Sequence, residues 1–404
     1  MLVEEANSAR LIEIGVIVAG AFDFVDSRAA QLAIEQADAR LRELHPDFAF
    51  DFVEVIRPEV LIEGRVEPVE LLTQALEERD NRRFDLTIVL TPAELNSVYL
   101  PVCIAAFSRP LDSAVISLSP IDPKALGFDS DRDTRIERIA RRVSRLLLHA
   151  IGHLTGLSPS DHPNDLMYCP TNPSAIDHMA ALTADDIEKQ REFLRRVADE
   201  RLEEGKDVYR MNSLQFALRS IFRNRKEILQ ATITAAPWDF PRRLSGLTIA
   251  SFSTVAILMM TAEAWDLAIN QGLSRVLGLA AFAIVVTTFY VIVRQQVLIR
   301  RRQRRSEQSV ATTTTGIAVV IAGMTFTWAV LFLVGFAVAW TLFSDQLIAN
   351  WAATTVQGPS QVVEMTRVVM AAFAASLGLI IGALGASFES QLYFRHVIYV
   401  DGEL

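Results

Sequence analysis

The chain has 404 residues, of which 51% are hydrophobic, and a formal net charge of −9. This length predicts two or three domains. The charge is split, because residues 1–205 contain 22 Lys and Arg against 37 Asp and Glu, a charge of −15, whereas residues 206–404 contain 17 against 11, a charge of +6. The acidic half lacks the basic face that nucleic-acid binding requires, which excludes nucleic acid as an expected partner. Two cysteines are too few for a disulfide framework.

The first half predicts alternating strands and helices. The β-rich run Leu11–Ala19 is typical of a buried strand, and Ser27 is a suitable N-cap for a helix over Arg28–Leu44. The later elements are, in order, a strand at Phe48–Ile56, a helix at Pro68–Glu78, a strand at Phe84–Leu90, a strand or hairpin at Tyr99–Phe107 and Ser113–Leu118, a long helix at Asp131–Thr155 and a last helix at Thr183–Glu204. This order predicts an α/β sandwich.

The second half contains four long apolar stretches, each of about 18 residues or more, which is enough to span a bilayer of roughly 30 Å. They are Leu244–Ala262, Val276–Val293, Gly316–Phe343 and Val368–Phe388. Residues 206–243, which precede them, combine aliphatic residues with arginines and indicate a basic amphipathic linker at the membrane surface. Ala374, Gly378, Gly382 and Ala386 form a small-residue stripe that favours close helix packing, within one bundle or between protomers of a homo-oligomer.

The charges next to these stretches predict the topology. Arg294, Arg300, Arg301, Arg302, Arg304 and Arg305 lie between the second and third stretches, whereas Glu263, Asp266 and Asp345 follow the first and third. By the positive-inside rule the arginine loop is cytoplasmic, so both termini are cytoplasmic as well. The acidic N-terminus is not expected to be a cleaved export signal. The sequence therefore predicts a multi-pass integral membrane protein.

Chemistry-bearing residues gather at the end of the long helix. His149 and His153 are four residues apart, so they share a helix face and can hold one metal ion. Gly156 permits a sharp turn that would bring in a third ligand. This is the spacing of an H-E-x-x-H zinc site, but the glutamate position, which supplies the general base, is occupied by Ala150.

The residues His149-x-x-Gly152-His153-x-x-Gly156-Leu157, Asp161-His162 and Leu166-Met167-Tyr168 together resemble the metzincin zinc metallopeptidases. Leu90–Leu95 and Ser113–Leu118 are similar to strands of the archaemetzincin branch, and Leu182–Ile187 is similar to the closing helix of matrixins. The resemblance covers roughly residues 10–200. It implies a zincin-like α+β sandwich with a mixed sheet and a long active-site helix. It also implies that Met167 lies in a turn beneath the metal and that the Ser113–Leu118 strand binds substrate along its edge.

By this resemblance His149 and His153 are the first two Zn²⁺ ligands, and the third is open. If the family pattern is aligned without a gap, Pro159 falls at the position of the third ligand, and proline cannot bind zinc through its side chain. With a three-residue insertion, His162 becomes the ligand, which we favour over Asp161 and over no third protein ligand. Of the cysteines that hold a second zinc in archaemetzincins, Cys169 alone has a counterpart here, which argues against a second metal.

These observations predict a cytoplasmic metzincin-like domain over 1–205, the linker over 206–243 and a four-helix transmembrane domain over 244–404. The predicted function is a membrane-anchored zinc metallopeptidase that acts on peptide or protein substrates. Because Ala150 cannot act as a general base, this chain is expected to be inactive, whether the alanine is engineered or natural. The alternatives are a non-catalytic pseudopeptidase that acts as a membrane sensor or scaffold and, third, a channel-like effector.

Overall fold

A computed structural model describes residues 10–58, 64–98, 100–124, 127, 131–198, 211–298, 306–353 and 363–404. The chain divides into two compact units. The first contains Met1–Ile228, Arg301–Thr312 and Tyr399–Leu404, and the second contains Leu229–Arg300 and Thr313–Ile398. The predicted arginine loop at 300–305 and the first residues of the predicted linker, 206–210, lie outside the described residues.

The first unit is built on a six-stranded sheet in the order β2-β1-β3-β5-β4-β6. The first three strands of the chain, β1 (Arg10–Ala19), β2 (Phe48–Arg57) and β3 (Leu86–Thr91), are joined by β5 (Ser113–Ser117) in a parallel array. The strands β4 (Ala105–Ser108) and β6 (Gly402–Glu403) run antiparallel to their neighbours. The predicted mixed sheet is therefore confirmed.

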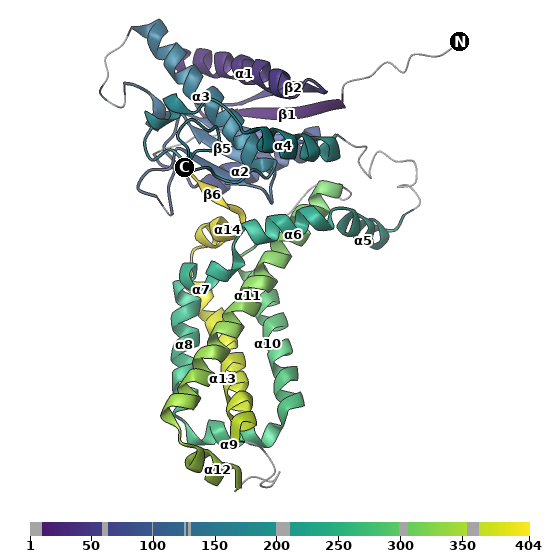
Figure 1. Cartoon of the computed structure of the whole chain (residues 1–404), viewed down its shortest axis with the longest axis vertical. Helices are drawn as coiled ribbons and strands as arrows, with labels where there is room; N and C mark the ends of the chain where they lie inside the picture. The colour runs from purple at the N-terminus through teal and green to yellow at the C-terminus, as the bar shows by residue number, and fades with distance from the viewer. Residues whose placement is uncertain are drawn as a thin grey trace. The chain divides into compact units, whose positions relative to one another are not determined.

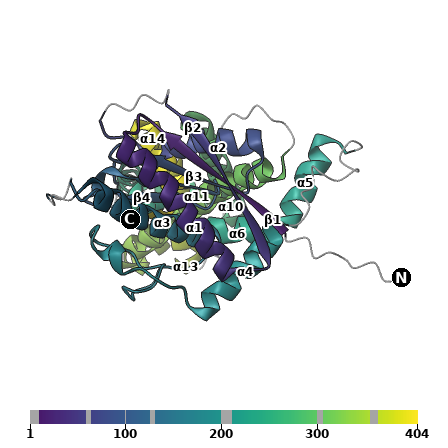
Figure 2. The same cartoon turned by 90° about the horizontal axis from the view of Figure 1, so that it is seen from above.

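Helices cover both faces of this sheet (Figures 1 and 2). The helices α1 (Phe24–Leu44) and α3 (Arg132–Leu154) pack together on one face, and α2 (Pro68–Arg82) covers the other. Because both faces are covered, every residue of β3 and β5 is buried, which explains their continuous apolar character. Two 3₁₀ turns and a helix complete the unit's sandwich: η1 (Ser119–Ile121), η2 (Ala175–His178) and α4 (Ala184–Val197).

Two expectations about these elements were wrong. The helix α1 begins four residues before Arg28, because Asp23 rather than Ser27 is its N-cap and accepts a 2.7 Å hydrogen bond from the amide of Asp26. The β5 strand does not offer an edge for substrate, because β3 and β4 flank it on both sides. The last long strand on this side of the sheet is β4, and the two-residue strand β6 pairs with its outer edge.

The described part of the predicted linker begins with two helices, α5 (Ser213–Arg223) and α6 (Arg225–Thr234). A capping box between Asn212 and Gln215 starts α5. Phe216 is buried and packs against Val310, whereas the side chains of Leu214, Leu218 and Phe222 are exposed on one helix face. This apolar stripe agrees with an amphipathic helix, and its role at a membrane surface stays a prediction.

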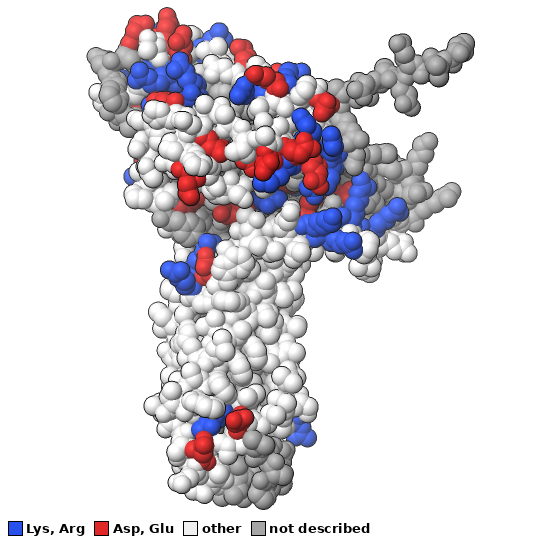
Figure 3. Space-filling model, in the orientation of Figure 1, with Lys and Arg blue, Asp and Glu red and all other residues white. Residues whose placement is uncertain are grey.

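The second unit is helical. Its elements are η5 (Pro237–Asp239), α7 (Phe240–Arg243), α8 (Ser245–Met259), α9 (Ala262–Gln271), α10 (Leu273–Arg294), α11 (Glu307–Leu342), which starts in the first unit, α12 (Asp345–Ala353), α13 (Val363–Gly385), η6 (Ala386–Phe388) and α14 (Gln391–Tyr399). By length and composition α10, α11 and the α13–η6 segment can each cross a membrane. The pair α8–α9 is bent by 88° and would count as a fourth crossing if it acts as one span. On the face drawn in Figure 3, this unit carries almost no charged side chain between its two ends.

The predicted small-residue stripe lies at a close helix contact inside this unit. A Cβ added to Gly382 would overlap Oγ of Ser251, and one added to Gly378 would lie 2.8 Å from Cγ2 of Val255. Both partners belong to α8, so the glycines allow the backbones of α13 and α8 to approach each other.

Candidate metal and peptide site

The two histidines lie on the last turns of α3, next to β4. His149 and His153 are one turn apart, and both rings contact Phe107 of β4, with ring centroids 5.3 Å and 4.9 Å from that of Phe107. The amphipathic pattern of α3 explains this placement, since its apolar face packs on the sheet and carries the histidines to the rim of the core. The structure therefore brings the first two predicted ligands together.

His149 has the hydrogen bonding expected of a metal ligand. Its Nδ1 donates to the carbonyl of Leu166 over 2.7 Å, which leaves the Nε2 lone pair free. Burial lowers the pKa of His149 to about 4. The imidazole is therefore neutral near pH 7, which is the form that binds metals.

His153 faces a residue that no sequence motif indicates. Its Nε2 lies 3.2 Å from Oδ1 of Asp401, which directly precedes β6. Burial lowers the pKa of His153 to about 3 and raises that of Asp401 to about 7. Near neutral pH the contact is consequently a hydrogen bond that involves a neutral imidazole, not an ion pair between two charged groups.

Asp401 is separated from His153 by 248 positions along the chain, so no local pattern could have predicted this contact. The run Asp401-Gly402-Glu403-Leu404 is acidic, which by itself is typical of a solvated segment. The glycine in this run, Gly402, is consistent with a close approach of the backbone, since a Cβ there would lie 3.1 Å from Nε2 of His153.

The turn below the histidines has the expected residues. Met167 is buried and its amide donates 2.8 Å to Oδ1 of Asp165. A Cβ added to Gly152 would lie 2.5 Å from Sδ of Met167, so this glycine lets the methionine pack against α3 between the two histidines. Gly156, with φ of 91°, adopts the left-handed conformation that ends the helix.

The predicted third ligand lies elsewhere. His162 and Asp161 are exposed on the loop after α3, and Ser160 accepts a 3.3 Å hydrogen bond from the amide of His162. Across the described ranges no three His, Cys, Asp or Glu side chains converge as a metal site. Ala150 is fully buried in the core between the histidines, and its methyl group can neither accept nor donate a proton.

The chain therefore fits a zinc ion in part. Two neutral imidazoles have the right donor type, and His149 presents a free nitrogen. Structural and catalytic zinc sites need at least three protein ligands, and the described residues supply two. The geometry supports a two-histidine half-site and no complete ligand set.

A cleft adjoins this site at the end of β6. It has a volume of about 660 Å³ and is lined largely by apolar and proline side chains, with Glu403 and Leu404 on its wall. The other lining residues include Leu100, Val102, Ile104, Pro170 and Pro173. Apolar walls with a few polar groups are typical of ligand-binding clefts.

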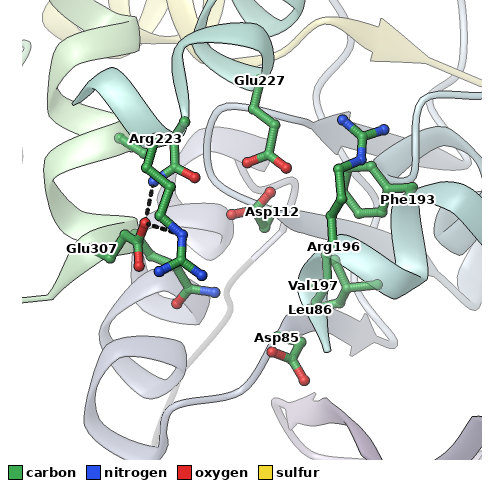
Figure 4. A pocket seen from close by; sticks show the side chains of 12 residues that line it. Asp85, Leu86, Asp112, Phe193, Arg196, Val197, Arg223, Glu227 and Glu307 are labelled. Atoms are coloured by element: carbon green, nitrogen blue, oxygen red, sulfur yellow. Dashed lines mark hydrogen bonds and ion pairs between the residues drawn. The ribbon is translucent and has the colours of Figure 1, made fainter. Parts of the chain in front are cut away.

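A second, smaller pocket of about 100 Å³ lies in the same unit and is lined by charged residues (Figure 4). In it Glu227 and Asp112 point toward each other, and burial, followed by the charge of Asp112, raises the pKa of Glu227. Glu307 of α11 accepts a 2.7 Å hydrogen bond from Asn224. The second contact ties Glu307 to the residue that ends α5, and the pocket contains neither histidine of the pair.

No protein-family profile and no curated protein sequence matches this chain. Several solved structures do, and they are archaemetzincin-like zinc peptidases. An archaemetzincin from Methanopyrus kandleri is 18% identical over 48% of this chain and 99% of its own, with a TM-score of 0.35. A zinc-dependent peptidase from Methanocorpusculum labreanum is 17% identical over 44% of this chain and 99% of its own, with a TM-score of 0.36.

Proposed function

We propose that this protein is a membrane-anchored, metzincin-type zinc metallopeptidase that, with Ala150 in place of the general base, binds peptides without cleaving them. The observation that carries this proposal is the orientation of His149. Its Nδ1 is bonded to the Leu166 carbonyl and its Nε2 is free, one turn from His153.

The peptide-binding part is supported by the strand beside the histidines. Phe107 of β4 contacts both rings, and β4 pairs with an antiparallel segment on its outer side. An extended peptide on that edge would pass its backbone over the histidine pair. His149 and His153 would hold a zinc ion there, which when bound supplies Lewis-acid chemistry, and Ala150 has no group that could take a proton.

The membrane part is supported by the path of the chain. The chain leaves the first unit after Ile228, returns for Arg301–Thr312 and returns again at Tyr399. Each return to the same side of a bilayer requires an even number of crossings. This favours four crossings, with α8 and α9 together counted as one.

The helix α8 alone has 15 residues, about 22 Å at 1.5 Å per residue, which is short for a bilayer of roughly 30 Å. The charge pattern favours a cytoplasmic first unit.

The test is zinc content and peptide cleavage of the full chain purified in detergent. We expect the unaltered chain to take up zinc through His149 and His153 after metal loading, more weakly than a three-ligand site does, and to leave a peptide library uncleaved. We expect His149→Asn to lose zinc, while His178→Asn, at an exposed histidine, keeps it. An unaltered chain free of zinc after metal loading would contradict the proposal.

Ala150→Glu distinguishes the two functions that the sequence left open. General-base catalysis contributes about 10²–10⁴-fold, so restored cleavage in this variant favours a disarmed peptidase. Bound zinc without cleavage favours a peptide-binding sensor or scaffold. The buried position of Ala150 favours the second outcome, because a carboxylate there enters the core of the unit.

A further inference from the structure

The outer edge of β4 is occupied by the chain's own residues 401–404. Ala106 is paired with Glu403 and Phe107 with Gly402. The amide of Ile104 donates to Leu404 over 2.5 Å, that of Leu404 to Ala105 over 2.8 Å, and that of Asp401 to Phe107 over 3.1 Å. This is the hydrogen-bond pattern of an added strand, in which the backbone supplies most of the affinity.

The side chains of this segment are held as specifically as its backbone. Oδ2 of Asp401 accepts a 3.0 Å hydrogen bond from the amide of Arg109, while Oδ1 lies at Nε2 of His153. Glu403 accepts hydrogen bonds from Oγ of Ser97 over 2.7 Å and from the amide of Val98 over 3.1 Å. The edge therefore has built-in partners for two acidic side chains.

The other two positions of the segment are selective for size and polarity. Gly402 passes so close to Phe107 and His153 that a Cβ would lie 3.3 Å and 3.1 Å from them. Leu404 is 4% exposed and lies at the mouth of the apolar cleft. Together the four subsites select an acid, a glycine, an acid and a large aliphatic residue.

We propose that the β4 edge is a docking site for an extended peptide of this acid-Gly-acid-aliphatic chemistry, and that residues 401–404 are its resident ligand. The segment covers His153 while it is bound, so it must leave before a peptide from another protein can enter. The β6 pairing has two residues, and α14 ends at Tyr399, two positions before Asp401. The short connection gives the segment a high effective concentration at the edge, which a peptide in solution must overcome. The proposal rests on the proposed function only for the role of the histidine pair.

The test uses a fluorescein-labelled peptide of residues 399–404 and the full chain in detergent micelles, measured by fluorescence anisotropy. A variant that lacks 401–404 is expected to bind the peptide at least tenfold more tightly than the unaltered chain. The same peptide with Val at the position of Gly402 is expected to bind at least tenfold more weakly to that variant. Equal binding of the first peptide to both chains, or no binding to the shortened chain, would overturn the proposal.

A second variant keeps the chain length and covers the case in which the shortened chain does not fold. Gly402→Val is expected to displace the segment and to open the edge to the labelled peptide. Gly278→Val is its control, because a Cβ at Gly278 meets nothing within 4 Å. If Gly402→Val and Gly278→Val bind the peptide equally, the resident-ligand proposal is wrong.

Zinc content of the same samples separates this proposal from the proposed function. Peptide binding without zinc would uphold the docking site and refute the metal function. Zinc binding without binding of the labelled peptide to either variant would uphold the metal function and refute the docking site.

Discussion

At the residue scale, the site depends on small side chains where α3 meets its neighbours. Gly152 gives Met167 its place between the two histidines, and Gly402 lets the terminal strand lie on His153. In each case the missing Cβ, not backbone freedom, is what the position requires. Single methyl groups therefore test the packing of the site.

Gly152→Ala is expected to destabilise the protein, although alanine is the better helix former. Its Cβ would lie 2.5 Å from Sδ of Met167, and such overpacking costs about 1–3 kcal/mol. Thermal unfolding in detergent measures this. The double variant Gly152→Ala with Met167→Ala is expected to be more stable than the sum of the two single effects predicts. Strict additivity would show that the two residues do not touch.

Asp26 predicts a pH dependence of stability outside the site. Burial, with smaller contributions from Asp23 and Asp122 and against that of Arg135, raises the pKa of Asp26 from 3.8 to about 6. A carboxyl whose pKa is raised by folding contributes stability while it is protonated. That contribution is fully present below about pH 4 and is lost as the pH rises through about 6.

Asp26→Asn is therefore expected to be more stable than the unaltered chain at pH 8, by about 1 kcal/mol after allowance for partial solvent exposure. The difference is expected to vanish at pH 4. Thermal midpoints at the two pH values check this, with Asp185→Asn, an exposed first-turn acid of α4, as control. A pH-independent difference would rule out the assigned titration.

At the element scale, the helical unit is organised around α13, which is more buried than α10 or α11. Its glycines contact α8 at backbone distance, whereas Gly335 of α11 lies at ordinary van der Waals distance from α13. Close approach of this kind replaces the hydrophobic effect as the source of helix association in lipid.

Gly382→Ala is expected to separate α8 from α13 and to lower the thermal midpoint of the purified protein. Its Cβ would lie 2.9 Å from the carbonyl of Leu247, which cannot move without α8. Gly335→Ala is the matched control, because its Cβ would lie 3.6 Å from Cα of Ala371. Equal midpoints for both variants would contradict the packing argument.

At the scale of the whole molecule, the proposed four crossings would place α12 and the turn between α9 and α10 on the side of the membrane opposite the N-terminal sandwich. In cells that express a chain with Cys169→Ser, an introduced cysteine at Gln346 is therefore expected to react with an impermeant maleimide. A cysteine at Asp131 is expected to react only after permeabilisation. Both positions are exposed. Labelling of Asp131→Cys in intact cells would reverse the proposed orientation.

The sequence by itself determined the features that depend on neighbours along the chain. The spacing of His149 and His153 fixes a shared helix face, and Gly156 ends that helix because only a residue tolerant of positive φ fits there. The apolar stretches at 276–293, 316–343 and 368–388 coincide, within one residue at their ends, with parts of long helical segments because their length and composition are local properties. The first stretch differs, since α8 ends at Met259 and the chain turns into α9.

Only the tertiary structure decided which strand has the free edge and what occupies it. Strand order depends on pairings between distant segments, so the sequence indicates a substrate edge at Ser113–Leu118, although β3 and β4 enclose the β5 strand there. The sequence indicates Ser27 as the cap that Asp23 provides, because both residue types suit that position and packing selects between them. Asp401 reaches His153 from the far end of the chain, and that contact follows from the fold as a whole.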